Sequence, residues 1–266
     1  MCPVLLKILA CICMLADHIG VFTDGTLYIV LRSVGRISFP LFAFLLAQGY
    51  HHTHSKRRYL ARLFLCGILS EVPYNLCFSG TVYAPGSINV LFTLALGLCA
   101  LFCLDQIPAF LTQKRNFSED LAALCGLVCC IPLILCAEWL HTDYGGWGVL
   151  LIMGMGLLCR RPVPLGTVLF LFSARECGAI AGGLLKSGAS PAEAFSAMVS
   201  ACAPDHIAGR ALFAFLALPF ILLCSDKQST FPHSLVGKRA LQYTFYLFYP
   251  AHLLSVALFM RVLPDL

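Results

Sequence analysis

The stretch VLLKILACICMLADHIGVF, residues 4–22, is long and apolar enough to cross a bilayer as one helix, yet it contains Lys7, Asp17 and His18. Ionisable side chains are costly inside a membrane, so those that occur there line polar cavities or pair with one another. Lys7 and His18 are eleven positions apart, which in an α-helix corresponds to about 16 Å of rise and a net rotation of about 20°. We therefore predict that both side chains share one face of the first membrane helix.

The rest of the chain has a similar composition, with 59% hydrophobic and 12% charged residues among 266, whereas about a quarter of the residues in soluble domains are charged. We predict an all-α, polytopic membrane helix bundle. It forms a single domain over residues 1–266, because no segment between the apolar runs could bury its own core. About nine transmembrane helices are expected, at residues 4–22, 28–50, 59–78, 88–104, 121–140, 147–159, 164–184, 207–224 and 241–262.

The basic residues predict the orientation, since cytoplasmic connections collect lysine and arginine. If the N-terminus is inside, the cytoplasmic connections hold Lys56, Arg57, Arg58, Lys114, Arg115, Arg160, Arg161, Lys227, Lys238 and Arg239. The opposite connections hold chiefly Lys186. We predict a multi-pass protein of the plasma membrane with a cytoplasmic N-terminus. The net charge of +5 lies in short loops without interleaved aromatic residues, so no nucleic-acid partner is expected.

The fifteen cysteines do not indicate a metal or a disulfide framework. Most lie within apolar spans, where cysteine behaves as a small hydrophobic residue. The tract His51, His52 and His54 is explained by a solvated loop, so we expect no metal site. Asp17 and His18 stand where a signal peptide would need small residues for cleavage, and we therefore expect the first span to be retained.

Asp17 and Glu71 are two of the acidic residues within the spans, and each needs a partner. Neighbouring residues of a helix point about 100° apart, so Asp17 is expected to pair with Arg32 or Arg36 on another helix rather than to orient His18 directly. Glu71, in the third span, either forms a salt bridge with Arg36 or Lys7 or helps to hold a substrate amine. Histidine titrates near neutral pH and is the usual proton acceptor for a hydroxyl or amine nucleophile, which makes His18 a candidate base.

Several blocks of sequence strongly resemble the TraX family, in which a founding member is implicated in N-terminal acetylation of a bacterial conjugative pilin. These blocks are LKI at residues 6–8, MLADHIG at 14–20, GRISFPLFAFL at 35–45, SEVPYNL at 70–76 and Asn89-Val90, with weaker matches at 144–148 and 246–253. TraX proteins are in turn similar to the acyltransferase-3 group of integral membrane acyltransferases. That group carries a basic residue, ten intervening residues and a histidine on its first helix, which is the pattern of Lys7 and His18.

The resemblance implies an integral membrane acyltransferase that moves an acetyl group from cytoplasmic acetyl-CoA to an amine or hydroxyl acceptor. Acetyl-CoA is the expected donor, and other acyl-CoA donors stay open. His18 would be the catalytic base, with Asp17, Arg36 and Glu71 organising the site, and Lys7 would position the donor. Arg57, Arg58 and Arg62 flank the cytoplasmic entry and would bind phosphates of coenzyme A, because arginine matches phosphate with two parallel donors. The substrate-binding candidates are Asn75, Asn89 and His252.

Each assignment has a simpler alternative. Lys7 could reach the headgroups with only its stem in the membrane, and His18 could be an interfacial residue at the end of its helix. Arg36 could belong to a structural ion pair. Arg57 and Arg58 could act only as positive charges that set the orientation of the chain in the membrane.

The identity of the acceptor also stays open, because transfer to a peptide N-terminus and transfer to a surface carbohydrate need the same base and the same donor. An O-acetyltransferase of surface carbohydrate is therefore the first alternative function. A transporter or channel is the second, although the sequence shows no inverted repeat of the kind many transporters have.

Overall fold

A computed structural model describes residues 2–84, 86–158, 161–224 and 235–262. Within these ranges the regular structure is helical, apart from one isolated bridge between Ile88 and Thr142. Seven helical segments of the described chain are long and apolar enough to cross a membrane: Pro3–Gly20, Gly25–His52, Lys56–Phe78, Val90–Arg115, Glu119–Trp139, Pro162–Lys186 and Ala240–Met260. The segments Gly145–Leu158 and Ile207–Leu222 are apolar but shorter. The predicted all-α, polytopic membrane bundle is confirmed, while the count of nine crossings and the cytoplasmic N-terminus stay predictions.

The chain divides into two compact units, which we describe separately. The first unit runs to Phe42 and resumes after α8; it contains α1 (Pro3–Gly20), α2 (Gly25–Gly35), the start of α3 (Ser38–His52), α9 (Pro162–Lys186), α10 (Pro191–Ser200), α11 (Ile207–Leu212), η1 (Phe213–Leu216) and α12 (Ala217–Leu222). The second unit contains the rest of α3, α4 (Lys56–Phe78), α5 (Val90–Arg115), α6 (Glu119–Val128), α7 (Ile131–Trp139), α8 (Gly145–Leu158) and α13 (Leu235–Val262). The single domain expected over residues 1–266 therefore stays a prediction.

In the first unit, α1 has two distinct faces. Its exposed large side chains are Leu5, Ile8, Ile12 and Ile19, which follow the helical period along one side. The buried side, which includes Leu6, Ala10 and Met14, packs with α2 as its main neighbour in this unit. Because the exposed stripe is purely apolar, it is suited to lipid, and the opposite face turns toward protein.

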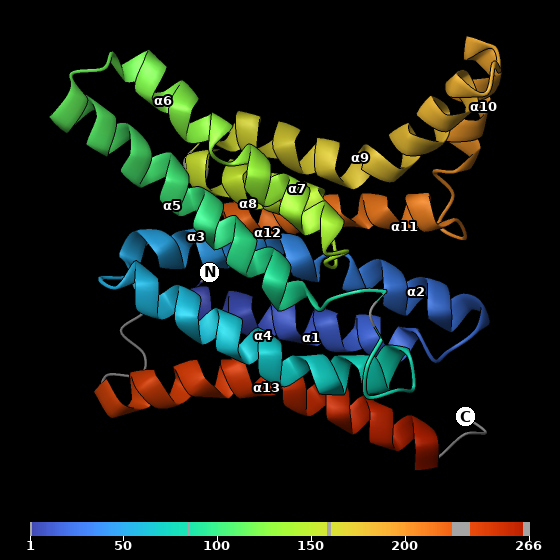
Figure 1. The fold of residues 1–266 in the computed structure, drawn as a ribbon. Helices are drawn as coiled ribbons and strands as arrows, with labels where there is room; N and C mark the ends of the chain where they lie inside the picture. Colours follow the sequence, from blue (N-terminus) through green and yellow to red (C-terminus); the bar gives the residue numbers. More distant parts are fainter. Residues whose placement is uncertain (1, 85, 159–160, 225–234, 263–266) are drawn as a thin grey trace. The chain divides into compact units, whose positions relative to one another are not determined.

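In the second unit, α5 is the central helix and packs against α4, α6, α7 and α8. A Cβ atom at Gly97 of α5 would overlap the Ile152 side chain of α8, so this glycine permits the close approach that membrane helices use in place of a hydrophobic driving force. Helices α4 and α13 lie side by side, and α5 and α6 form a hairpin (Figure 1).

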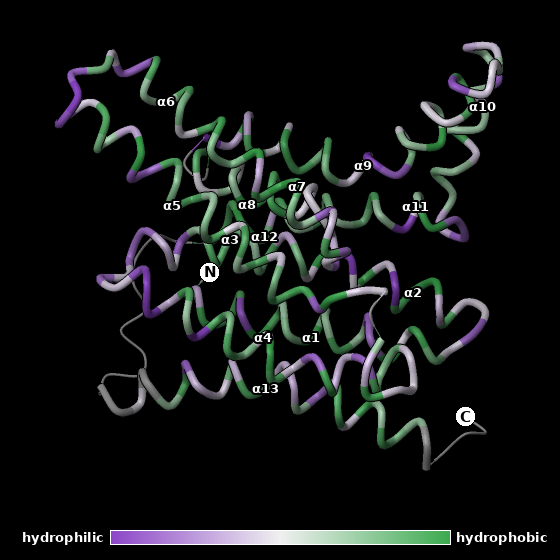
Figure 2. The backbone as a smooth tube through the Cα atoms, in the orientation of Figure 1, coloured by the Kyte–Doolittle hydropathy of each residue, from purple (hydrophilic) through white to green (hydrophobic). Residues whose placement is uncertain are grey.

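The second unit has polar groups at both ends. At one end the Tyr50 hydroxyl donates to Asp105 Oδ2 at 2.9 Å, and Lys56 pairs with the same carboxylate. At the other end Ile88 donates to the His141 carbonyl at 3.1 Å. Figure 2 shows hydrophobic residues along most of α5 and α8, with hydrophilic segments at helix ends, as expected for membrane-crossing elements.

The boundaries differ from the prediction in several places. Helix α5 continues past Leu104 to Arg115, where the left-handed Asn116 caps it; Asp105 lies within the helix and bonds to Lys56 and Tyr50. The second predicted span is two helices with a turn at residues 36–37, and the fifth is interrupted at 129–130. The helix α10 lies in a segment expected to be a connection. Of the predicted topology charges, Arg160, Lys227 and the side chains of Lys238 and Arg239 lie outside the described residues.

Candidate functional site

The polar stripe of α1 is the first part of the candidate site. Helix α1 is continuous from Pro3 to Gly20, so Lys7 and His18 lie about 16 Å apart along one face. Cys11 and Met14 occupy the same stripe, at four and seven positions after Lys7. His18 is only 8% exposed and Lys7 is partly buried, on a different face from the exposed leucine and isoleucines of α1. The predicted common face of Lys7 and His18 therefore agrees with the continuous helix, and this face is more buried than the one with the exposed leucine and isoleucines.

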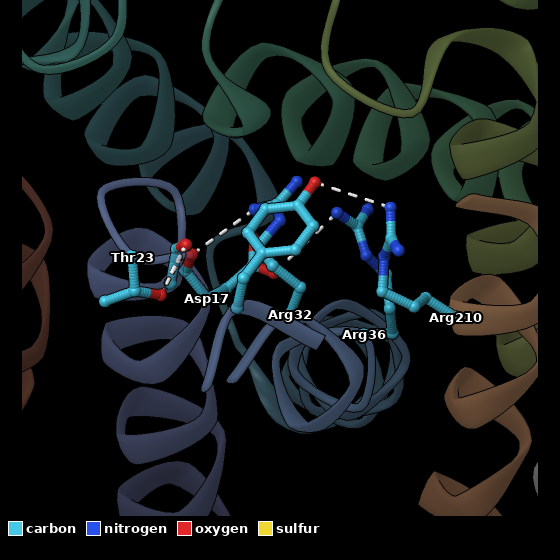
Figure 3. A network of polar contacts seen from close by, with 7 residues as sticks. Asp17, Thr23, Arg32, Arg36 and Arg210 are labelled. Carbon is cyan, nitrogen blue, oxygen red and sulfur yellow. Dashed lines mark hydrogen bonds and ion pairs between the residues drawn. The ribbon is translucent and has the colours of Figure 1, made fainter. Parts of the chain in front are cut away.

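Asp17 anchors a polar network between α1 and α2 (Figure 3). Arg32 donates through Nη1 to Asp17 Oδ2 at 2.8 Å and to the Asp17 carbonyl at 3.3 Å. The second carboxylate oxygen, Oδ1, lies 3.7 Å from Nη2 of Arg36. The prediction that Asp17 pairs with an arginine of another helix is confirmed, and both candidate arginines contribute. Asp17, Arg32 and Arg36 are largely shielded from water. Removing one of these charges is therefore expected to cost more stability than breaking an ion pair on the surface would.

A glycine allows this network to form. A Cβ atom at Gly35 would overlap the Oδ1, Cβ and Cγ atoms of Asp17. Any larger residue would therefore displace the carboxylate from its position between Arg32 and Arg36. In the motif at residues 35–45, Gly35 is explained by this packing requirement, since its backbone is helical and needs no special conformation.

Arg210 was not predicted as a site residue, although it belongs to the same unit. It is 6% exposed and donates through Nη1 to the carbonyls of Pro204 at 3.3 Å and Asp205 at 2.7 Å. Its Nη2 lies 3.4 Å from the Tyr28 hydroxyl, and its guanidinium carbon lies 4.9 Å from the centre of that ring. The signal in the sequence was an arginine four residues into an apolar segment, which by itself does not reveal the partner on α2.

Glu71 and Asn89 form a buried polar connection in the second unit. Asn89 donates through Nδ2 to Glu71 Oε2 at 2.5 Å and to the Gly67 carbonyl at 2.9 Å. Its side-chain oxygen accepts from the Leu91 N–H at 3.0 Å and caps α5. Asn89 is fully buried, so this arrangement joins the C-terminal half of α4 to the start of α5 and fixes the orientation of the Glu71 carboxylate.

Replacing Asn89 by alanine is expected to destabilise the protein by about 2–4 kcal/mol, since it removes a helix cap and two buried hydrogen bonds, one of them to a carboxylate. The midpoint of thermal unfolding in detergent measures the effect. Ser118→Ala is the matched control, because Ser118 caps α6 in the same way through Leu121 but is exposed, and its side chain makes no second hydrogen bond among the described residues. Equal losses from the two variants would contradict a role for the Glu71 and Gly67 contacts.

The remaining substrate-binding candidates, Asn75 and His252, are also buried in the second unit. Asn75 is 2% exposed, with Nδ2 donating to the Val82 carbonyl at 3.5 Å and Oδ1 buried without a hydrogen-bond partner in the described chain. The Nδ1 atom of His252 lies 2.7 Å from the Phe248 carbonyl, and its ring stacks on Phe248 with centroids 4.6 Å apart. Asn75 is thus held by the connection that follows α4, and His252 by its own helix α13.

The basic donor-binding candidates lie at the start of α4. Arg57 and Arg58 are exposed, whereas Arg62, one turn further, is half-buried and within reach of the Tyr246 hydroxyl on α13. The Nε atom of Arg62 is buried without a hydrogen-bond partner among the described residues. Thus the structure holds Lys7, Asp17, His18 and Arg36 in the first unit, and the other candidates, Arg57, Arg58, Arg62, Glu71, Asn75, Asn89 and His252, in the second.

Comparison with known proteins identifies the family. The model of the family described as "TraX protein" matches residues 4–260, nearly the whole chain. The chain belongs to the TraX family. The family match covers the α1 stripe, the Asp17 network and the Glu71–Asn89 connection of this TraX protein, so these features lie within the family's common region.

Two curated relatives match over shorter stretches. A probable fimbrial assembly protein, FimC of serogroup H1, from Dichelobacter nodosus is 36% identical over 106 residues, covering 36% of this chain and 43% of that protein. An uncharacterized protein of Rickettsia prowazekii is 27% identical over 158 residues, covering 59% of this chain and 55% of that protein. The chain thus spans about half the length of the curated relatives it matches. No solved structure matches.

Proposed function

We propose that this TraX protein is an integral membrane acyltransferase that moves an acetyl group from cytoplasmic acetyl-CoA to an amine or hydroxyl acceptor, such as the N-terminus of a pilin-like peptide. The proposal rests on one observation: Lys7 and His18 lie on the same, more buried face of α1, about 16 Å apart along the helix. Similarity to a fimbrial assembly protein supports an acceptor of the pilin type.

In this proposal His18 acts as the general base. Its imidazole takes the proton of the acceptor amine or hydroxyl as the nucleophile attacks the thioester carbonyl. The carbon–sulfur bond then breaks, and His18 returns the proton to the departing coenzyme A thiolate. The acceptor gains the acetyl group and the donor leaves as free coenzyme A, so no covalent intermediate on the protein is needed.

The other residues position the reactants. Lys7 attracts the anionic donor toward the stripe from the predicted cytoplasmic side, and the arginines at the start of α4, Arg57, Arg58 and Arg62, bind its phosphates. Asp17 and Arg36 fix the end of α1 that carries His18. Glu71, oriented by Asn89, supplies the carboxylate that holds the acceptor, together with Asn75 and His252.

The test uses purified protein in liposomes and radiolabelled acetyl-CoA, with a peptide bearing a free α-amino group and a simple sugar as alternative acceptors. We expect label to appear in one acceptor and free coenzyme A to be released in equal amount. Absence of both donor binding and transfer, together with transmembrane movement of a solute, would contradict the proposal and favour a transporter.

Lys7→Gln is expected to raise the KM for acetyl-CoA by about tenfold, with a smaller effect on kcat, because it removes one charge-assisted contact to the donor. Lys7→Arg keeps the charge and should restore much of the affinity. Lys186→Gln, an exposed lysine at the end of α9, is the matched control and should leave KM unchanged. An unchanged KM in Lys7→Gln would exclude Lys7 from donor binding.

A further inference from the structure

Arg210 is a buried cation whose hydrogen-bond partners in the described chain are all neutral. It is 6% exposed, and its contacts are two backbone carbonyls and the Tyr28 hydroxyl. Burying a guanidinium without a counter-ion is costly, so a buried arginine of this kind is a candidate site for a charged ligand. The carbonyls of Pro204 and Asp205 hold one edge of the guanidinium, and these contacts fix its direction without neutralising its charge.

Two further arginines of the same unit lie on the side of α2. Helices α2 and α11 are in contact, and in Figure 3 the Arg36 and Arg210 side chains extend toward the same region. Arg32 on α2 and Arg36, directly after its end, both contact the single carboxylate of Asp17. Tyr28 adds a ring face and a hydroxyl beside Arg210. Basic donors and a hydroxyl that converge in this way match the oxygens of a carboxylate or phosphate.

We propose that Arg210 binds an anionic oxygen group, a carboxylate or a phosphate, carried by the acceptor. The assignment to the acceptor rests on the proposed function, in which the phosphates of the donor lie toward Lys7. Asp17 lies ten positions beyond Lys7 on α1, about 15 Å further along the helix. The Arg210 region is joined to that far end through α2, on the side where His18 meets the acceptor. The substrate class is therefore an amine or hydroxyl that also carries an acidic group.

The anion site is tested without donor or acceptor. Purified protein in phosphatidylcholine nanodiscs is titrated with inorganic phosphate against chloride at constant ionic strength, and the thermal unfolding midpoint is measured. We expect phosphate to raise the midpoint of the wild type, and Arg210→Gln to weaken the apparent phosphate affinity by about tenfold or more. Arg161→Gln, an exposed arginine of the same unit, should respond as the wild type does.

Arg210→Lys keeps the test decisive if Arg210→Gln does not fold. This variant keeps the charge but loses the paired donors, so phosphate should bind it about three- to tenfold more weakly than the wild type. Equal phosphate responses in the wild type and the Arg210 variants, or none in the wild type, would overturn the site. Loss of the response when phosphatidylglycerol is added would assign the site to a lipid headgroup and overturn the acceptor assignment.

The acceptor assignment has its own measurement. A tripeptide amide with glutamate at its second position is compared with the same peptide containing glutamine, using labelled acetyl-CoA. The wild type should prefer the acidic peptide by about tenfold in kcat/KM, and the preference should fall to about one in Arg210→Gln. Transfer without this preference would overturn the acceptor assignment. Phosphate binding at Arg210 with no transfer to either peptide would instead sink the proposed function and leave the anion site standing.

Discussion

Replacing His18 by alanine is expected to lower the rate of acetyl transfer by about 10²–10⁴-fold, because it removes the proposed general base. The protein should still insert in membranes and bind acetyl-CoA with an affinity close to that of the wild type. The loss should therefore fall on kcat rather than on the donor KM. Radiolabelled transfer by purified protein and equilibrium binding of the labelled donor measure the two effects separately.

The matched control is His54→Ala, which removes an exposed histidine from the connection between α3 and α4. It should retain the activity of the wild type within about twofold, as surface substitutions generally do. His18→Gln tests whether a polar side chain that cannot accept a proton is sufficient. Activity near that of the wild type in either His18 variant would exclude this residue as the base.

Replacing Asp17 by alanine is expected to destabilise the protein by about 3 kcal/mol and to reduce transfer strongly. The change leaves Arg32 without the carboxylate that it contacts at 2.8 Å, and breaking a largely buried pair by removing one partner is costly. It also removes the contact with Arg36 and the packing of Asp17 against Gly35. Thermal unfolding in detergent and labelled transfer provide the two readouts.

A double-mutant cycle separates the charge effect from lost packing. Arg32→Gln combined with Asp17→Asn removes both charges, so the double variant should be more stable than the sum of the single losses predicts. Gly35→Ala should mimic part of the Asp17 defect, because its methyl group would occupy the position of the carboxylate. Additive losses around the cycle would show that Asp17 and Arg32 do not interact.

Much of the fold could be predicted because membrane crossings depend on the length of apolar runs, and each predicted span has a helical counterpart in the described chain. The helix α10 was missed, although Ser190 and Glu193 form a capping box that the sequence displays. The extension of α5 past Leu104 was missed because the predicted span ended at the first charged residue, Asp105, whose partners Lys56 and Tyr50 are distant in sequence.

The candidate site was only partly accessible to sequence reasoning. The spacing of Lys7 and His18 fixes their common face once a helix is assumed, and the pairing of Asp17 with arginines followed from the cost of a buried charge. The hydrogen-bond partners of Asn89 and Arg210 could be identified only from the three-dimensional structure. Asn89 bonds to Glu71 eighteen residues earlier, and Arg210 contacts Tyr28 across 182 residues. No local pattern encodes such contacts.

The central claim is that the donor lies along the α1 stripe between Lys7 and His18, and photo-crosslinking tests it most directly. A photoreactive analogue of acetyl-CoA is activated on the purified protein, and the labelled peptides are mapped by mass spectrometry. We predict labelling within Pro3–Gly20, on the face of Cys11 and Met14, that excess acetyl-CoA suppresses. Labelling confined to the lipid-facing Leu5, Ile8 and Ile12, or unaffected by acetyl-CoA, would contradict the account.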